Sequence, residues 1–270
     1  MKIFVQAAGL LAPGLEGWSN GIAVLAGRRP FVPTELPKID LDFLPRNERR
    51  RATPSIRMAL AVAKEATANR DDLQDICSVF ACSGGDPETL DKVCTALTLA
   101  NKPVSPMHFT NSVHNAPAGH WSIATRSQQA STSLSAYDAT FAAGLLEAAT
   151  MIQVEHVDVL LVVYDVPPPP ALWPFRPLAA PFAMALLLSA GEEPASLAGF
   201  SLSMATGLNE HTMQSEHLEA VRLGNPAARG LPLLSAMARL HNSEIVLPYL
   251  PGSQLVADLE CCAGAQGAAA

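Results

Sequence analysis

Residues 131–163, STSLSAYDATFAAGLLEAATMIQVEHVDVLLVV, contain the pattern that decides the fold. Residues 131–135 are small and suited to a β-strand, and Tyr137-Asp138-Ala139 is typical of a turn. Residues 139–154 predict a long helix rich in small side chains. Residues 157–163 are an apolar run with one polar residue, Asp158, near its start, and such a run is typical of a central parallel strand buried on both faces. The pattern therefore places Asp138 where a strand and a turn lead into a helix.

Strand and helix patterns alternate on both sides of this stretch and predict a parallel α/β sheet. Ser55, which follows Pro54, is the expected N-cap of a helix that ends near Asn69. The other predicted strands comprise residues 3–8, 76–82, 182–188, 198–204, 244–247 and 254–259. We expect the third and fourth of these strands to form a hairpin on the same sheet and the last two to pair with each other. The other predicted helices comprise residues 88–100, 118–127 and 231–240.

Three segments lack a regular pattern. Residues 26–54 predict an irregular connection rich in proline and arginine, residues 107–113 are also irregular, and residues 208–230 are polar with interspersed glycine and proline. The predicted helix over residues 88–100 has one apolar face that we expect to be buried. The residues of that face are Leu90, Val93, Leu97 and Ala100.

The composition limits the classes of partner. The chain has 270 residues, of which 16% are charged, whereas about 25% is average. A chain this poor in charge buries much of its surface, in its own core or against a partner. The net charge of −7 argues against nucleic acid as the main partner, because phosphate binding requires a basic surface.

The cysteines and the apolar segments indicate a cytoplasmic protein. The five cysteines are odd in number, and their spacing fits neither a disulfide framework nor a zinc site, so we expect a reducing compartment and no metal. Gln6 interrupts the N-terminal apolar stretch, which argues against a signal peptide. Residues 157–163 and 178–188, the longest apolar runs, are shorter than the roughly 20 residues that span a bilayer. Residues 261–270, rich in alanine and glycine, predict a disordered tail.

A motif precedes the turn at Asp138. Ser105-Pro106 is followed by Asn115-Ala116-Pro117-Ala118-Gly119-His120-Trp121-Ser122-Ile123. With the turn and the small-residue helix, this segment resembles the β-ketoacyl synthases, which have Ser-Pro, an Asn, Ala-Gly-His, a Ser/Thr-Ile pair and then a Thr-Ala-Cys turn. Counting forwards from Ser122 or backwards from Met151 places Asp138 at the position of the nucleophilic cysteine.

The resemblance covers nearly the whole chain, is strongest from Phe43 to Asp165 and is loose after Ala205. It implies a thiolase-like α/β fold with a complete first half and a reduced second half, as one N-terminal-type synthase domain over residues 1–260. In the family, the second half supplies two catalytic histidines. His211, His217 and His241 lie in that region here, but their sequence context does not match, and we expect surface histidines.

Asp138 would not replace the cysteine in catalysis. In the family, a helix N-terminus lowers the pKa of the thiol and raises its reactivity. The same helix end stabilises a carboxylate as an anion, so Asp138 is a poor nucleophile toward a thioester. Its expected structural role is to cap the helix that starts at Ala139.

A synthase-like chain without its cysteine resembles the chain length factors, and specifically a short branch from aryl polyene biosynthesis. Leu44-Pro45, Arg49-Arg50-Arg51 and residues 111–121 support this resemblance. It implies a non-catalytic subunit that pairs with an active ketosynthase and sets the length of polyene acyl chains. Those chains are held on phosphopantetheinylated acyl carrier protein, and the subunit needs no cofactor of its own.

The resemblance also implies which residues face the partner and its acyl tunnel. These residues are His108, Phe109, Ser112 and Val113. Each has an ordinary alternative: Phe109 and Val113 as core residues, and His108 as a capped or solvated histidine.

Other residues permit different functions. Cys82 follows a strand, so Cys82 or Ser83 could be the nucleophile of a self-sufficient acyltransferase or hydrolase, although a buried free cysteine is commoner. Ser83-Gly84-Gly85-Asp86 before a helix could bind phosphate, but it lacks the P-loop spacing. The arginines could contact an acidic carrier protein, which leaves a carrier-protein-binding scaffold as a third possibility, or they could form a solvated face. These arginines are Arg46, Arg49, Arg50 and Arg51.

Overall fold

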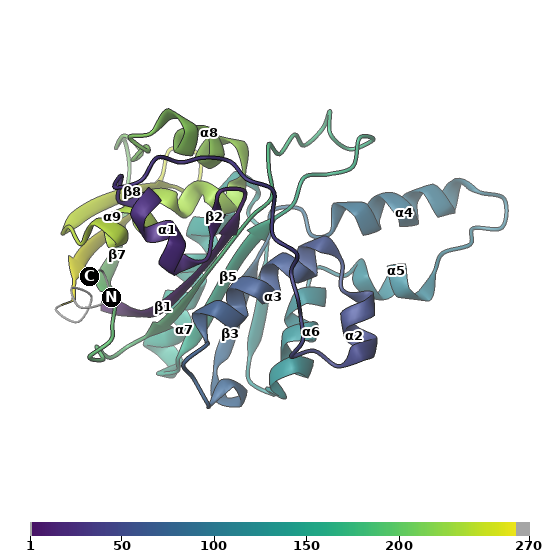
Figure 1. Ribbon diagram of the computed structural model, residues 1–270, viewed down its shortest axis with the longest axis horizontal. Helices are drawn as coiled ribbons and strands as arrows, with labels where there is room; N and C mark the ends of the chain where they lie inside the picture. Colours follow the sequence, from purple (N-terminus) through teal and green to yellow (C-terminus); the bar gives the residue numbers. More distant parts are fainter. Residues whose placement is uncertain (1, 263–270) are drawn as a thin grey trace.

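The computed structural model describes residues 2–262, which form one nine-stranded sheet with helices on both faces (Figure 1). The strands are β1 (Lys2–Ala12), β2 (Leu15–Glu16), β3 (Cys77–Ala81), β4 (Ser131–Leu134), β5 (Val159–Asp165), β6 (Phe182–Ser189), β7 (Ala198–Ala205), β8 (Ser243–Pro248) and β9 (Gln254–Cys261). Their order is β4-β3-β5-β6-β1-β7-β9-β8, with β2 paired to the end of β1.

Helices connect and cover these strands. The α-helices are α1 (Trp18–Leu25), α2 (Arg46–Arg51), α3 (Pro54–Ala66), α4 (Pro87–Thr98), α5 (Pro106–Asn111), α6 (Ala116–Thr125), α7 (Thr140–Glu155), α8 (Glu216–Gly224) and α9 (Leu231–Arg239). Three short 3₁₀ turns are η1 (Leu73–Asp75), η2 (Tyr137–Ala139) and η3 (Pro226–Gly230). The sequence pattern missed α1, α2, α5 and α8, which all have nine residues or fewer, and α8 also lies within the polar segment.

The sheet is mixed, whereas a parallel sheet was predicted. Only β4, β3 and β5 run parallel to one another, and each remaining pair is antiparallel. Parallel neighbours require a crossover such as α7 between β4 and β5. Residues 166–181, which follow β5, contain no helix, and the chain returns antiparallel as β6.

The predicted hairpin of the strands now labelled β6 and β7 is wrong, because β1 lies between them. Phe4 is paired with Ser189 of β6 on one side and with Gly199 of β7 on the other. β1 is almost entirely buried, so it requires a neighbour on both edges. The predicted pairing of the last two strands is confirmed as β8 with β9.

β5 supplies the centre of two hydrophobic cores, as its unbroken apolar sequence predicted. Val159, Leu161 and Val163 contribute to the core beneath α7, α9 and α1, whereas Leu160 and Val162 contribute to the core beneath α3 and α6. All seven residues of β5 are buried. The sheet is therefore covered on both faces at its centre.

Two predictions of local structure near α3 are corrected. Thr53, not Ser55, caps α3, since the Thr53 hydroxyl accepts a hydrogen bond from the Ile56 amide at 3.4 Å. Pro54 occupies the first turn, where its missing N–H costs nothing. Ser55 is inside the helix and buried. The residues predicted as irregular at 107–113 largely form α5, and the arginine-rich part of residues 26–54 forms α2.

α4 and α5 extend from the sheet as an arm, which we call the α4–α5 arm and define as residues 87–111 (Figure 1). The predicted buried face of α4 is wrong, because Leu90 and Leu97 are 47% and 49% exposed and Ala100 is also exposed. Only Thr89 is buried in this helix. The arm therefore presents apolar side chains that this chain does not cover.

The predicted disordered tail is wrong in its first two residues. Cys261 is the last residue of β9, and Cys262 is buried. Residues 263–270 of that tail lie outside the described residues. Between residues 2 and 262, no helix is both long and apolar enough to cross a membrane.

Gly9→Ala tests the close packing of α3 on β1. An added Cβ would lie 2.2 Å from the backbone oxygen of Val62, so α3 would have to move. We expect a loss of about 3 kcal/mol in the free energy of unfolding, measured by urea denaturation. Gly119→Ala in α6 is the matched control, because its Cβ would meet nothing within 4 Å, and a helical alanine should be neutral or stabilising. Equal stability of the two variants would contradict this packing.

Candidate functional site

Asp138 lies in the η2 turn and is not a helix cap. The first residue of α7 is Thr140, and no side chain caps that helix end. The Asp138 carboxylate instead forms an ion pair with Nη1 of Arg176 at 2.8 Å. Tyr137, which precedes it, has a φ of +54°, in the left-handed region that few non-glycine residues adopt. The predicted N-cap role of Asp138 is therefore wrong.

Arg176 holds this turn from the loop between β5 and β6. Its guanidinium stacks on the ring of Tyr137 at 3.7 Å, in addition to the ion pair with Asp138. Asp138 also interacts with a second guanidinium, that of Arg229. Burial and the neighbouring Arg222 lower the pKa of Arg229, whereas the charge of Asp138 opposes that change. Asp138 thus acts as a counterion for arginine. The sequence analysis missed Arg176, whose one available signal was a lone cation in a loop of prolines and aromatic residues.

A buried polar network lies at the ends of β3 and β5. Oδ1 of Asp165 accepts hydrogen bonds from the Ser83 amide at 2.9 Å, the Ser83 hydroxyl at 2.8 Å and the Cys82 thiol at 3.3 Å. Burial raises the pKa of Asp165 to about 6. Burial and the neighbouring Asp165 raise the pKa of Cys82, so its thiol stays protonated.

This network does not activate a nucleophile. Within residues 2–262, no histidine forms a hydrogen bond with Cys82 or Ser83. A reactive cysteine requires a lowered pKa and access to substrate, and Cys82 is fully buried. The phosphate site considered at residues 83–86 is also opposed, because Asp86 caps α4 through the Thr89 amide at 2.8 Å and places a carboxylate where an anion would bind.

The residues predicted to face a partner lie in α5 and directly after it, on the returning side of the α4–α5 arm. Phe109 is 68% exposed, and Ser112 and Val113 are also exposed, so Phe109 and Val113 are not core residues. His108 is half-buried on the same short helix. The arm is anchored at its base, where the Asn111 side chain donates to the Arg51 carbonyl at 2.8 Å.

The other histidines and the arginine run take ordinary positions. His211, His217 and His241 are exposed, as expected, and Nδ1 of His211 accepts from the Val246 amide. In α2, Arg49 and Arg51 form long ion pairs with acidic neighbours at 3.9 and 3.5 Å. Arg46 and Arg50 are exposed on the same helix.

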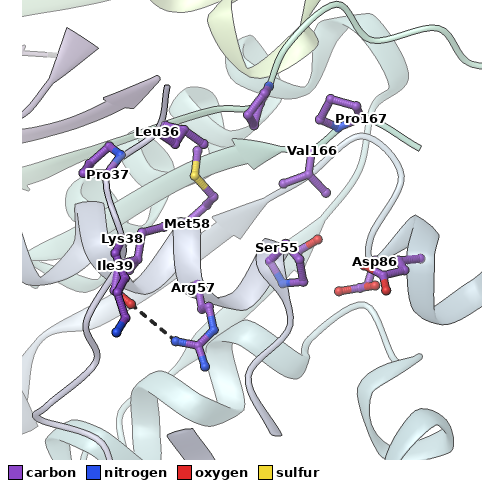
Figure 2. Close-up of a pocket in the computed structure, with 13 residues that line it drawn as sticks. Leu36, Pro37, Lys38, Ile39, Ser55, Arg57, Met58, Asp86, Val166 and Pro167 are labelled. Atoms are coloured by element: carbon purple, nitrogen blue, oxygen red, sulfur yellow. Dashed lines mark hydrogen bonds between the residues drawn. The ribbon is translucent and has the colours of Figure 1, made fainter. Parts of the chain in front are cut away.

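A cavity of 560 Å³ opens beside the polar network, and we call it the α3 pocket (Figure 2). It lies between the connection before α2, the first turns of α3 and α4, and the residues that follow β5. Its lining residues are Leu36, Pro37, Lys38, Ile39, Pro54, Ser55, Arg57, Met58, Asp86, Glu88, Val166, Pro167 and Pro181. The pocket is distinct from the turn at Asp138, which contributes no lining residue.

Residues 26–243 match the family described as β-ketoacyl synthase, N-terminal domain, so the chain belongs to this family. A search of curated protein sequences found no match.

Solved structures share the fold. One is the ketosynthase ApeO in complex with its chain length factor ApeC from Xenorhabdus doucetiae, at 22% identity and a TM-score of 0.71. Another is the ishigamide ketosynthase/chain length factor, at 14% identity and a TM-score of 0.72. A third, AntDE:AntF, is a type II acyl-carrier protein in complex with its ketosynthase, at 13% identity and a TM-score of 0.71. The similarity covers 96–97% of this chain and 99% of each of those chains, which confirms the predicted thiolase-like fold with a reduced second half.

Asp165→Asn tests the buried carboxyl group. Because the pKa of Asp165 is about 6 when folded and 3.8 ordinarily, the folded state binds the proton more tightly. The tighter proton binding stabilises the folded state by up to about 3 kcal/mol. This stabilisation is complete below about pH 4 and is lost as the pH rises through about 6. The variant lacks it, so the stability difference between native and variant protein should change between about pH 4 and pH 7, measured by urea unfolding. A pH-independent difference would contradict the raised pKa.

Proposed function

We propose that this chain is a non-catalytic chain length factor that pairs with an active ketosynthase. The pair would elongate a polyene acyl chain on acyl carrier protein by decarboxylative Claisen condensation. The partner supplies the cysteine and the histidines, and this chain completes the interface and sets the depth of the acyl tunnel. The observation that carries the proposal is the turn before α7, where Asp138 is paired with Arg176.

The chemistry at this turn supports a non-catalytic role. A thioester is attacked by a soft, polarisable thiolate, whereas a carboxylate held by a guanidinium is a weak nucleophile. Arg176 also stacks on Tyr137 and thereby fastens the loop over residues 166–181 to the turn. Asp138 stays exposed, so these contacts neutralise its carboxylate without burying it.

The surface supports pairing with another subunit. The α4–α5 arm exposes Leu90, Leu97 and Phe109, and contiguous exposed apolar side chains mark interaction sites. β4 is the end strand of the sheet and pairs only with β3 among the described residues. An uncovered strand edge offers backbone groups for pairing with a second chain. His114 links the two features, because its Nε2 lies 3.0 Å from the Leu134 carbonyl oxygen at the end of β4.

Acyl carrier protein is the proposed carrier of the growing chain, through its phosphopantetheine group, and the site of action is proposed to be the cytoplasm. The exposed Arg46 and Arg50 of α2 are the cations that an acidic carrier protein would contact. The alternative is that these arginines form a solvated face. No cofactor bound to this chain itself is proposed.

The alternative of a self-sufficient acyltransferase or hydrolase is disfavoured by the burial and raised pKa of Cys82. It is tested directly by purifying the chain alone and assaying hydrolysis of an acyl thioester. Turnover that Cys82→Ala abolishes would overturn the chain-length proposal. A chain that binds carrier protein but no ketosynthase would instead be a scaffold.

The interface is tested by co-expression with an active ketosynthase of the proposed partner class. Leu97→Asp and Phe109→Asp place a charge on the apolar surface of the arm and should weaken the complex by about tenfold or more, measured by size-exclusion chromatography and titration. Val154→Asp is the matched control, since Val154 is exposed on α7 and away from the arm. If the native chain forms no complex, the proposal fails, and if both arm variants bind like the control, the arm is not the interface.

The tunnel is tested in the intact complex by changing side-chain volume. Val113→Phe and His108→Trp should shorten the products, and Val113→Ala and His108→Ala should lengthen them, because the space available to the chain end changes. Mass spectrometry of the released products is the measurement, with Val154→Phe as the control. Unchanged product length in all four variants would remove His108 and Val113 from the tunnel.

A further inference from the structure

The α3 pocket lies where an α/β sheet usually binds small molecules. Asp86 follows β3, and Val166 and Pro167 follow β5, so the pocket is at the carboxyl ends of two parallel strands. β5 is parallel to β3, and in open α/β sheets ligands bind outside the carboxyl ends of such strands. Its 560 Å³ is within the range of about 300–1,000 Å³ typical of ligand sites.

The walls of the pocket are mainly apolar. Met58, Val166 and Leu36 lie around it with four prolines (Figure 2). The cation Arg57 is already used, since its guanidinium donates to the carbonyls of Ile39, Arg49 and Ala52. The walls therefore suit a hydrocarbon group.

One side of the pocket has two polar atoms without partners. Ser55 is only 2% exposed, and among the described residues neither its hydroxyl nor Oδ2 of Asp86 has a hydrogen-bond partner. Figure 2 shows the Ser55 hydroxyl directed toward the side where Asp86 lies. The Asp86 carboxylate cannot easily turn away, because its other oxygen caps α4 through the Thr89 amide. Buried polar atoms are nearly always satisfied, so the hydroxyl of a water molecule or of a ligand completes this pair.

A hydroxyl group is the partner that satisfies both atoms. Its proton is donated to Oδ2 of Asp86, and its oxygen accepts the proton of the Ser55 hydroxyl. An anion is disfavoured next to Asp86 and Glu88, because both are acidic and the lining cation Lys38 lies beside Ile39, away from Asp86 (Figure 2). A metal ion fits poorly, because residues 2–262 contain no group of three or more His, Cys, Asp or Glu side chains that could hold one.

We propose that the α3 pocket binds a neutral apolar molecule that ends in a hydroxyl group, with Ser55 and Asp86 as its polar contacts. The site goes beyond the proposed pairing with a ketosynthase, because it is formed by this chain alone. It can therefore be tested without the partner, and its failure would leave the chain-length proposal untouched.

The test uses the full chain with ¹³C-methyl methionine, and it follows the Met58 methyl signal by NMR, assigned by its loss in Met58→Leu. The probes are 1-hexanol, its methyl ether and hexanoate. The alcohol should shift the Met58 signal in a saturable manner at millimolar concentration. The ether, which cannot donate a proton to Asp86, should bind about three- to tenfold more weakly, and hexanoate should not bind.

Two variants and a control identify the polar contacts. Ser55→Ala should weaken alcohol binding by about threefold or more, because one hydrogen bond is lost. Asp86→Asn can keep the cap on α4 but replaces the free acceptor with a donor, so the preference for alcohol over ether should disappear. Glu88→Gln, a lining residue without an orphaned buried atom, should retain that preference. Equal affinity of native protein for alcohol and ether, or no Met58 shift with either, would overturn the proposal.

Discussion

The complete burial of β5 is the constraint on which the rest of the structure depends. Alternate residues of this strand enter two different cores, so the chain must place helices on both faces of the sheet. α7 covers one face and α3 the other, and their positions bring the η2 turn, the start of α3 and the end of β5 to the same end of the sheet. The turn with Asp138, the polar network and the α3 pocket all result from that arrangement.

The same burial determines the chemistry at the end of β5. Asp165 is the last residue of this dry strand, and its burial raises its pKa. Burial, with the neighbouring Asp165, also raises the pKa of Cys82. The thiol that follows β3 is thus a structural donor. The more exposed acid, Asp138, is neutralised by Arg176. The thiol of Cys82 and the carboxylate of Asp138 are both satisfied within this chain, which agrees with the proposed subunit that contributes surface more than chemistry.

Apolar surface is distributed unevenly between the sheet and the arm. The sheet core is closed, whereas the α4–α5 arm exposes Leu97 and Phe109 and the β4 edge lacks a second neighbour among the described residues. The low charge content thus has two sources: a strand layer buried on both faces and an arm whose apolar residues are uncovered. The exposed arm supports the proposed need for a partner.

The sequence by itself determined the central strand, the helix after it and the turn that holds Asp138, because apolar periodicity and turn residues act over a few neighbouring positions. Through its resemblance to a family, it also identified the exposed residues of α5 and of the segment directly after it. Only the tertiary structure decided that β1 separates β6 from β7, that α4 leaves the sheet and that Arg176 pairs with Asp138. Strand order depends on which strand edges remain free. The exposure of α4 depends on whether any element packs against it, and an ion pair between two loops depends on how the chain folds back. None of these is a local property of sequence.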